Sequence, residues 1–143
     1  MAESERPPNA VYFIDTNIWL YAFIQTQDHE KTRIASSFIR TCDCVLSTQI
    51  INEISVNLIR KALFTENQIA DLILSFYQRF TVLAFSKEIL LSASRLRKGH
   101  SFSFWDSLVV ASALLADADY LVTEDMQNGL QIRKKLTIVN PFE

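Results

Sequence analysis

The chain has 143 residues, of which 49% are apolar and 21% are charged, and its formal net charge is −2. This length suits one domain with a core of its own, and no apolar run approaches the ~20 residues that span a bilayer. The slight negative charge excludes a uniformly basic nucleic-acid binder, so any contact with nucleic acid must come from a local basic patch.

The predicted elements alternate between strands and helices along the chain. The first ten residues, MAESERPPNA, are polar and contain two prolines, so we expect a flexible tail (1–10) before a single domain (11–143). β-favouring apolar runs predict strands at Val11–Ile14, Cys44–Ser47, Thr81–Phe85, Tyr120–Thr123 and Thr137–Val139. Apolar residues at helical spacing and capping residues predict helices at Ile18–Phe23, His29–Arg40, Thr48–Phe64, Glu66–Phe80, from Ser86 to about Arg97, and from Ser103 to about Ala116.

Short strands joined through helices predict an α/β fold. We expect a three-layer α/β/α sandwich with a central parallel sheet of about five short strands and right-handed crossovers.

Scarce residue types exclude several kinds of site. The chain has two glycines, which excludes a P-loop and a GxGxxG turn, because both need several glycines near a phosphate. Cys42 and Cys44 are separated by one residue, and His29 and His100 are far apart, so neither pair has the spacing of a zinc or CxxC redox motif. The cysteines are those of an ordinary cytoplasmic protein. A bound phosphate would therefore be held by another route, such as metal ions.

Acidic residues follow the predicted strands at their carboxyl ends, where open parallel sheets bind ligands. Asp15 directly follows the first strand, and Glu124 and Asp125 follow the fourth. Glu53 lies in the helix after the second strand, on a polar stripe. Asp106 lies in the first turn of a helix whose start faces the same edge, among aromatic and apolar residues that predict partly buried surroundings.

Each acid also has an ordinary structural explanation. Asp15 and Asp106 can cap helices, Glu53 can be an exposed helix residue, and Asp125 can belong to a turn. As a set at one edge, however, the carboxylates repel one another, and a divalent cation removes that repulsion. Oxygen-only ligands suit Mg²⁺ or Mn²⁺ rather than zinc, and phosphodiester hydrolysis is the natural chemistry of such a site.

In this order, the acidic motifs resemble those of PIN-domain ribonucleases, especially the VapC-type toxins of toxin–antitoxin pairs. The stretches are FIDTN (13–17), the helical Glu53, FWDSLVVASAL (104–114) and LVTED (121–125). The resemblance implies an endoribonuclease that uses one or two Mg²⁺ or Mn²⁺ ions. It also implies a homodimer inhibited by a small antitoxin protein whose tail enters the site.

The resemblance assigns catalysis and metal binding to Asp15, Glu53, Asp106 and Asp125. Glu124 stays open as a replacement for Asp125 or an assistant to it. Asp15 and Asp106 would bind the principal ion, and Glu53 would hold the attacking water or take its proton.

Three polar residues are assigned as supports of these acids. Thr16 and Asn17 match the residues that orient Asp15, and Thr123 supplies a similar hydroxyl.

Basic residues before the Asp106 helix are the best candidates for RNA contact, although a solvated charged face explains them equally. They are Arg95, Arg97, Lys98 and His100, and further candidates are Arg133, Lys134 and Lys135, and Arg60 and Lys61.

Two rival functions are weighed against the nuclease. A haloacid-dehalogenase-like phosphatase expects an aspartate at position 17 and a lysine before the last acidic motif. Asn17 stands at that position, and residues 101–123 contain no lysine. A non-catalytic RNA- or protein-binding module with the same fold stays open.

Overall fold

A computed structural model of the chain describes residues 1–24 and 28–143. Its strands form one sheet with the order β3-β2-β1-β4-β6-β5. The strands are β1 (Val11–Ile14), β2 (Asp43–Ser47), β3 (Thr81–Leu83), β4 (Tyr120–Val122), β5 (Gln131–Ile132) and β6 (Leu136–Val139). The helices are the 3₁₀ turn η1 (Glu3–Glu5), α1 (Thr16–Phe23), α2 (His29–Thr41), α3 (Thr48–Ala62), α4 (Glu66–Arg79), α5 (Lys87–Gly99) and α6 (Phe104–Leu115).

The five strands predicted from the sequence are parallel, as expected, but the sheet is mixed. Strands β3, β2, β1, β4 and β6 pair in parallel, whereas β5 is a sixth strand that pairs antiparallel with β6. The predicted central parallel sheet of about five strands is therefore confirmed, and β5 is an additional antiparallel strand at its edge. The turn between β5 and β6 uses Arg133 and Lys134, both at a φ of 53°. Hairpin turns with such positive φ angles usually carry Asn or Gly, so this turn has no hairpin signal in the sequence.

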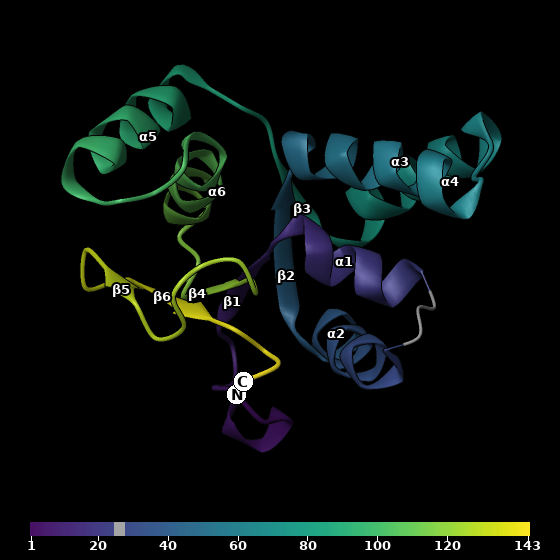
Figure 1. The fold of residues 1–143 in the computed structure, drawn as a ribbon, viewed down its shortest axis with the longest axis horizontal. Coiled ribbons are helices and arrows are strands. Elements are labelled where there is room, and N and C mark those ends of the chain that lie inside the picture. Colours follow the sequence, from purple (N-terminus) through teal and green to yellow (C-terminus); the bar gives the residue numbers. More distant parts are fainter. Residues whose placement is uncertain (25–27) are drawn as a thin grey trace.

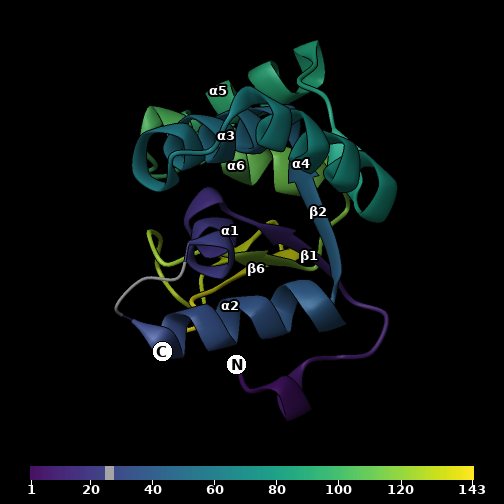
Figure 2. The same cartoon turned by 90° about the vertical axis from the view of Figure 1, so that its right-hand side faces the viewer.

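Helices cover both faces of the sheet, which confirms the three-layer α/β/α architecture. Figure 1 shows α1, α2, α3 and α4 to the right of β1 and β2, and α5 and α6 toward the upper left. Figure 2 turns the first group toward the viewer, with α5 and α6 behind. This division follows from right-handed crossovers, because the chain moves from β1 out to β3 on one face and returns to β4 on the other.

A buried tryptophan fixes α1 against the end of β1. The Trp19 side chain is fully buried, and its Nε1 donates to the Ile14 carbonyl at 3.0 Å. Its ring meets Phe76 and Phe80 edge-on, with centroid distances of 5.2 and 5.1 Å. Buried aromatic pairs of this kind stabilise by about 0.5–1.5 kcal/mol beyond their area. The junction between β1 and α1, where Asp15 lies, is therefore held by the core.

The N-terminal ten residues lie against α2. The Arg6 guanidinium is 3.6 Å from the Phe38 ring centroid and donates to the hydroxyls of Ser37 and Thr41. The flexibility of this segment, and the assignment of residues 11–143 to one domain, stay predictions. Among residues 1–24 and 28–143, no helix is both long and apolar enough to cross a membrane.

Candidate active site

Four acidic side chains from four different elements line one cavity at the carboxyl edge of the sheet. This acid cavity has a volume of about 220 Å³. Its lining residues are Asp15, Thr16, Asn17, Glu53, Asn57, Trp105, Asp106, Val109 and Asp125. The sheet brings the first and last of these together, because β1 and β4 are parallel neighbours with Ile14 opposite Val122. The residues that follow the two strands therefore lie side by side.

Asp15 is a buried carboxylate with two hydrogen bonds. Its side chain caps α1 by accepting the backbone N–H of Thr16 at 2.8 Å, and it accepts the Thr123 hydroxyl at 2.8 Å. Burial raises its pKa to about 6, the nearby charges of Asp125 and Glu53 add to the rise, and the two hydrogen bonds oppose it. The capping role expected from the sequence is thus real, but a cap alone does not require burial beside two other acids.

Thr16 and Asn17 hold other acids than the one predicted. The Thr16 hydroxyl donates to Glu53 Oε2 at 2.6 Å, and the Asn17 amide donates to Asp125 Oδ2 at 3.1 Å. The contact between Thr16 and the Asp15 carboxylate is made by the Thr16 backbone N–H and not by its hydroxyl. The physical reason is that both residues begin α1, where successive side chains point about 100° apart. They therefore reach neighbours on opposite sides of Asp15.

The Thr123 hydroxyl forms hydrogen bonds with two of the acidic residues. The side chain is fully buried; its hydroxyl donates to Asp15 and accepts the backbone N–H of Asp125 at 3.2 Å. Glu53 receives a second bond from the Gln49 amide at 3.3 Å. These bonds connect β1, α1, α3 and the loop after β4 into one polar network around the acid cavity.

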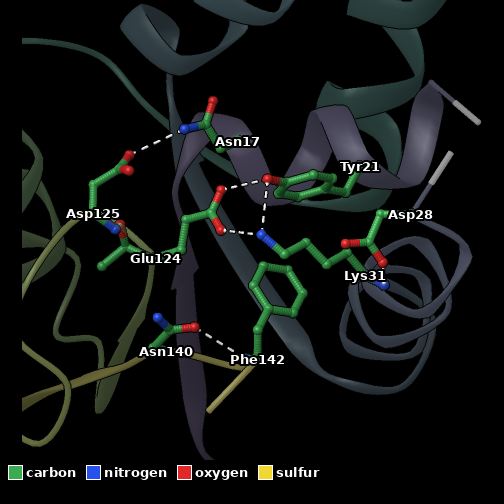
Figure 3. Close-up of polar contacts among 9 residues, drawn as sticks. Asn17, Tyr21, Asp28, Lys31, Glu124, Asp125, Asn140 and Phe142 are labelled. Atoms are coloured by element: carbon green, nitrogen blue, oxygen red, sulfur yellow. Dashed lines mark hydrogen bonds and ion pairs between the residues drawn. The ribbon is translucent and has the colours of Figure 1, made fainter. Parts of the chain in front are cut away.

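Glu124 turns away from the acid cavity, which separates it from Asp125. Figure 3 shows the Glu124 carboxylate facing both Tyr21 and Lys31; it accepts from the tyrosine hydroxyl at 2.6 Å and from the ammonium at 2.9 Å. The ammonium also lies 5.0 Å from the ring centroid of Phe142. Of the two adjacent acids left open by the sequence, Asp125 is the one that lines the acid cavity. Burial raises the pKa of Asp125, and the charges of Glu124 and Asp106 add to the rise.

Asp106 lies where the acid cavity meets a second, larger cavity. Its backbone N–H donates to Ser103 Oγ at 3.1 Å, which is the N-cap bond expected for α6. Asp106 and Asp125 both line the second cavity, whose volume is about 700 Å³. Arg97, Lys98 and His100 line it too, and we call it the basic cavity.

Arg95 is the one residue of the predicted basic group that does not line the basic cavity; it lies exposed on α5. Arg97 donates to Ser107 Oγ at 2.7 Å, and its guanidinium lies 4.3 Å from the Phe104 ring centroid. The sequence analysis did not assign Trp105 to the site. Its side chain lines the acid cavity and is 61% exposed. Asp106 is therefore partly buried, as predicted, but the aromatic residue that precedes it is exposed to solvent.

The acid cavity fits a divalent cation by its donor chemistry. Within the described ranges, no three Asp, Glu, His or Cys side chains converge as they stand into a group that could hold an ion. Magnesium does not need such a cage, because it usually binds one or two carboxylates and keeps several waters. The raised pKa values of Asp15 and Asp125 mark carboxylates that an added positive charge would relieve.

Comparisons with known proteins show which family the chain resembles. Residues 12–128 match the model of the PIN domain. The fold resembles a toxin–antitoxin complex from Klebsiella pneumoniae, with a TM-score of 0.68, 20% identity, and coverage of 94% of this chain and 99% of that one. It also resembles VapC20 of Mycobacterium tuberculosis, a toxin that cleaves the sarcin–ricin loop, with a TM-score of 0.62, 15% identity, and coverage of 77% and 86%.

A third solved structure, FitAcB from Neisseria gonorrhoeae, has a TM-score of 0.62 and 16% identity, and the match covers 92% of this chain and 98% of that one. A comparison with curated protein sequences found no match. The match to the family model covers most of the chain, and it confirms the resemblance drawn from the acidic motifs. The chain belongs to the PIN domain family.

Proposed function

We propose that the protein is a divalent-metal-dependent endoribonuclease and the toxin of a type II toxin–antitoxin pair. The observation that carries the proposal is the convergence of Asp15, Glu53, Asp106 and Asp125 on one cavity at the carboxyl edge of a parallel sheet. Neither rival function needs four acids from four elements in one place. Capping and turn chemistry explain single members of the set but not the set.

Each acid has a distinct task in this proposal. Asp15 and Asp106 would hold the principal Mg²⁺ or Mn²⁺ ion, and Asp125 would complete the acidic wall. When bound, the cation neutralises charge on the scissile phosphate and makes the attacking water more acidic. Glu53 takes the proton of that water as general base. The Thr16 hydroxyl fixes one oxygen of Glu53 at 2.6 Å, so its carboxylate is oriented before the substrate arrives.

The supports of the other acids keep them apart. Thr123 holds Asp15, and Asn17 holds Asp125, so neither carboxylate is free to rotate toward the other. The products are a 5′-phosphate and a 3′-hydroxyl, by resemblance to the family.

The biological setting follows from the relatives. The Klebsiella structure is a toxin–antitoxin complex and VapC20 is a toxin that cleaves an RNA loop. By analogy, the protein acts in the cytoplasm as a homodimer, without a membrane, and is inhibited by a small antitoxin.

The test is RNA cleavage by the purified protein in Mg²⁺ or Mn²⁺, with 5′ ends mapped by sequencing. Asp15→Asn and Asp106→Asn should each abolish cleavage while the circular dichroism spectrum stays native. Asp71→Asn, which changes an exposed acid on α4, is the matched control and should keep full activity. Full cleavage by a folded Asp15→Asn protein would overturn the assignment.

Calorimetric titration with Mn²⁺ separates the nuclease from the non-catalytic module. A nuclease site takes up the ion with an affinity that Asp106→Asn lowers, whereas a degenerate site gives no binding heat.

A further inference from the structure

An indole ring stands exposed at the mouth of the acid cavity. The two tryptophans of the chain differ sharply, since Trp19 is fully buried whereas Trp105 is 61% exposed. Trp105 directly precedes Asp106 and lines the acid cavity together with Asp15 and Glu53. Most of the ring surface lies in water beside the carboxylates, where it is available to a ligand.

The ring is held in place by a chain of contacts behind it. Trp105 meets Phe104 edge-on, at a centroid distance of 5.4 Å and an interplanar angle of 79°. The Arg97 guanidinium covers Phe104 at 4.3 Å and is itself fixed by Ser107 Oγ at 2.7 Å. Ser107 is fully buried, so this chain is anchored in the body of α6.

The basic cavity continues from the acid cavity on the far side of Asp106. Arg97, Lys98 and His100 line it, and Asp106 and Asp125 belong to both cavities. A polyanion whose one phosphate lies at the acids would therefore meet cations with its next phosphates. The aromatic ring and the acids thus line one cavity, and the basic residues line an adjoining cavity that shares Asp106 and Asp125 with it.

We propose that Trp105 is a stacking platform for an unpaired base beside the scissile phosphate, and that the basic cavity receives the neighbouring phosphates. The inference rests on the proposed nuclease function and assigns to Trp105 the discrimination between an unpaired base and a duplex. A base inside a duplex is stacked on both faces, so only an unstacked base can lie on the indole. Cation contacts alone accept a duplex as readily as a single strand, so it is the ring that discriminates.

The test measures RNA binding apart from cleavage, in an Asp15→Asn background with Mg²⁺. The probes are an unstructured oligouridylate of roughly eight nucleotides and an RNA duplex of equal length. Adding Trp105→Ala should weaken binding of the oligouridylate ~5- to 150-fold, the range found when a stacking aromatic is removed. Trp105→Phe should retain most of the affinity, and duplex binding should stay the same in all variants.

Two further variants serve as controls for this test. Leu115→Ala removes an exposed apolar side chain from the other end of α6 and should leave binding unchanged. Lys98→Gln should lower the slope of log affinity against log salt by ~0.7, as expected for the loss of one phosphate contact on a single strand.

The failures of this inference and of the nuclease function are distinguishable. Loss of binding in Trp105→Ala without any cleavage by the wild type would support the platform and overturn the nuclease. Cleavage by the wild type, with unchanged oligouridylate affinity and unchanged KM in Trp105→Ala, would overturn the platform alone. A Trp105→Ala protein that changes its mass in sedimentation but not its RNA affinity would place the ring in a protein interface and also overturn it.

Discussion

Neutralising Asp15 should stabilise the metal-free protein at neutral and alkaline pH. The carboxylate is 8% exposed and faces Glu53 from α3 and Asp125 from the loop after β4, with Asp106 on the same cavity wall. Asp15→Asn keeps the side-chain shape and an oxygen that accepts the Thr16 N–H, but it removes the buried charge. The variant should therefore lose the penalty of the buried charge, while the Thr123 hydroxyl would have to accept from the new amide group instead of donating to a carboxylate oxygen.

The magnitude follows from the pKa of Asp15, which is raised from the ordinary value of 3.8 to about 6. Between these two pH values the folded chain holds a proton that the unfolded chain releases. The stability that this group contributes is present below pH 3.8 and is lost as the pH rises to about 6. At 1.36 kcal/mol per pKa unit, the full loss is about 3 kcal/mol. Because the protein relaxes around the buried charge, we expect Asp15→Asn to raise the free energy of unfolding by about 1–3 kcal/mol at pH 8.

Urea unfolding in EDTA at pH 4 and pH 8 measures this difference, with Asp71→Asn as the control that changes an exposed acid. Wild type and Asp15→Asn should be nearly equal at pH 4, and the variant should be more stable at pH 8. Saturating Mg²⁺ at pH 8 should narrow or reverse the order, because an ion at 100 times its Kd stabilises the binding-competent wild type by about 2.7 kcal/mol. Identical pH dependence of the two proteins in EDTA would refute the reasoning.

Two further predictions concern the supports of the acids. Thr123→Val keeps the buried shape but removes the hydroxyl between Asp15 and the Asp125 N–H, and it should cost about 1.5–3 kcal/mol in urea unfolding at pH 8. The cost should be smaller at pH 4, where Asp15 is protonated; an equal cost at both pH values would assign the hydroxyl to packing alone. Lys31→Met breaks a partly exposed pair with Glu124 and should cost only about 0.5–1 kcal/mol of stability. It should nevertheless lower kcat for RNA cleavage with little change in KM, because Glu124 holds the loop that carries Asp125; Lys31→Arg should restore most of the rate, and an unchanged kcat in Lys31→Met would contradict this role.

The three-layer architecture and the acids of the cavity could be predicted from the sequence because both depend on local patterns. Buried strands are recognisable in the sequence as short apolar runs. Because the strands are parallel, the residues that follow each of them lie at the same edge of the sheet. This rule alone placed Asp15 at the edge, and it placed Glu124 and Asp125 there together without choosing between them. The two-residue strand β5 could not be predicted, because it is too short for an alternation and its turn lacks Gly and Asn.

The hydrogen-bond partners of the polar side chains could not be predicted from the sequence, for a different reason. Whether the Thr16 hydroxyl turns to Asp15 or to Glu53 depends on how α1 is rotated against α3, which no local pattern encodes. The separation of Glu124 from Asp125 depends likewise on Lys31 arriving from α2. The exposure of Trp105 was hidden because aromatic residues near an acid usually indicate burial, whereas burial along α6 begins only at Ser107.

The bonds that tie the loop after β4 to the end of β1 have a consequence for synthesis. Thr123 with Asp15, and Asn17 with Asp125, are pairs separated by 108 residues. β1 is made early but becomes a central strand only when β4 inserts beside it. Domains take shape as they leave the ribosome at about 5–20 residues per second, so a nascent chain carries Asp15, Glu53 and Asp106 for seconds without the strand that aligns them. On the proposed function, we therefore expect a growing polypeptide to leave the surrounding RNA uncleaved until β4 and Asp125 have left the ribosome and β4 has paired with β1.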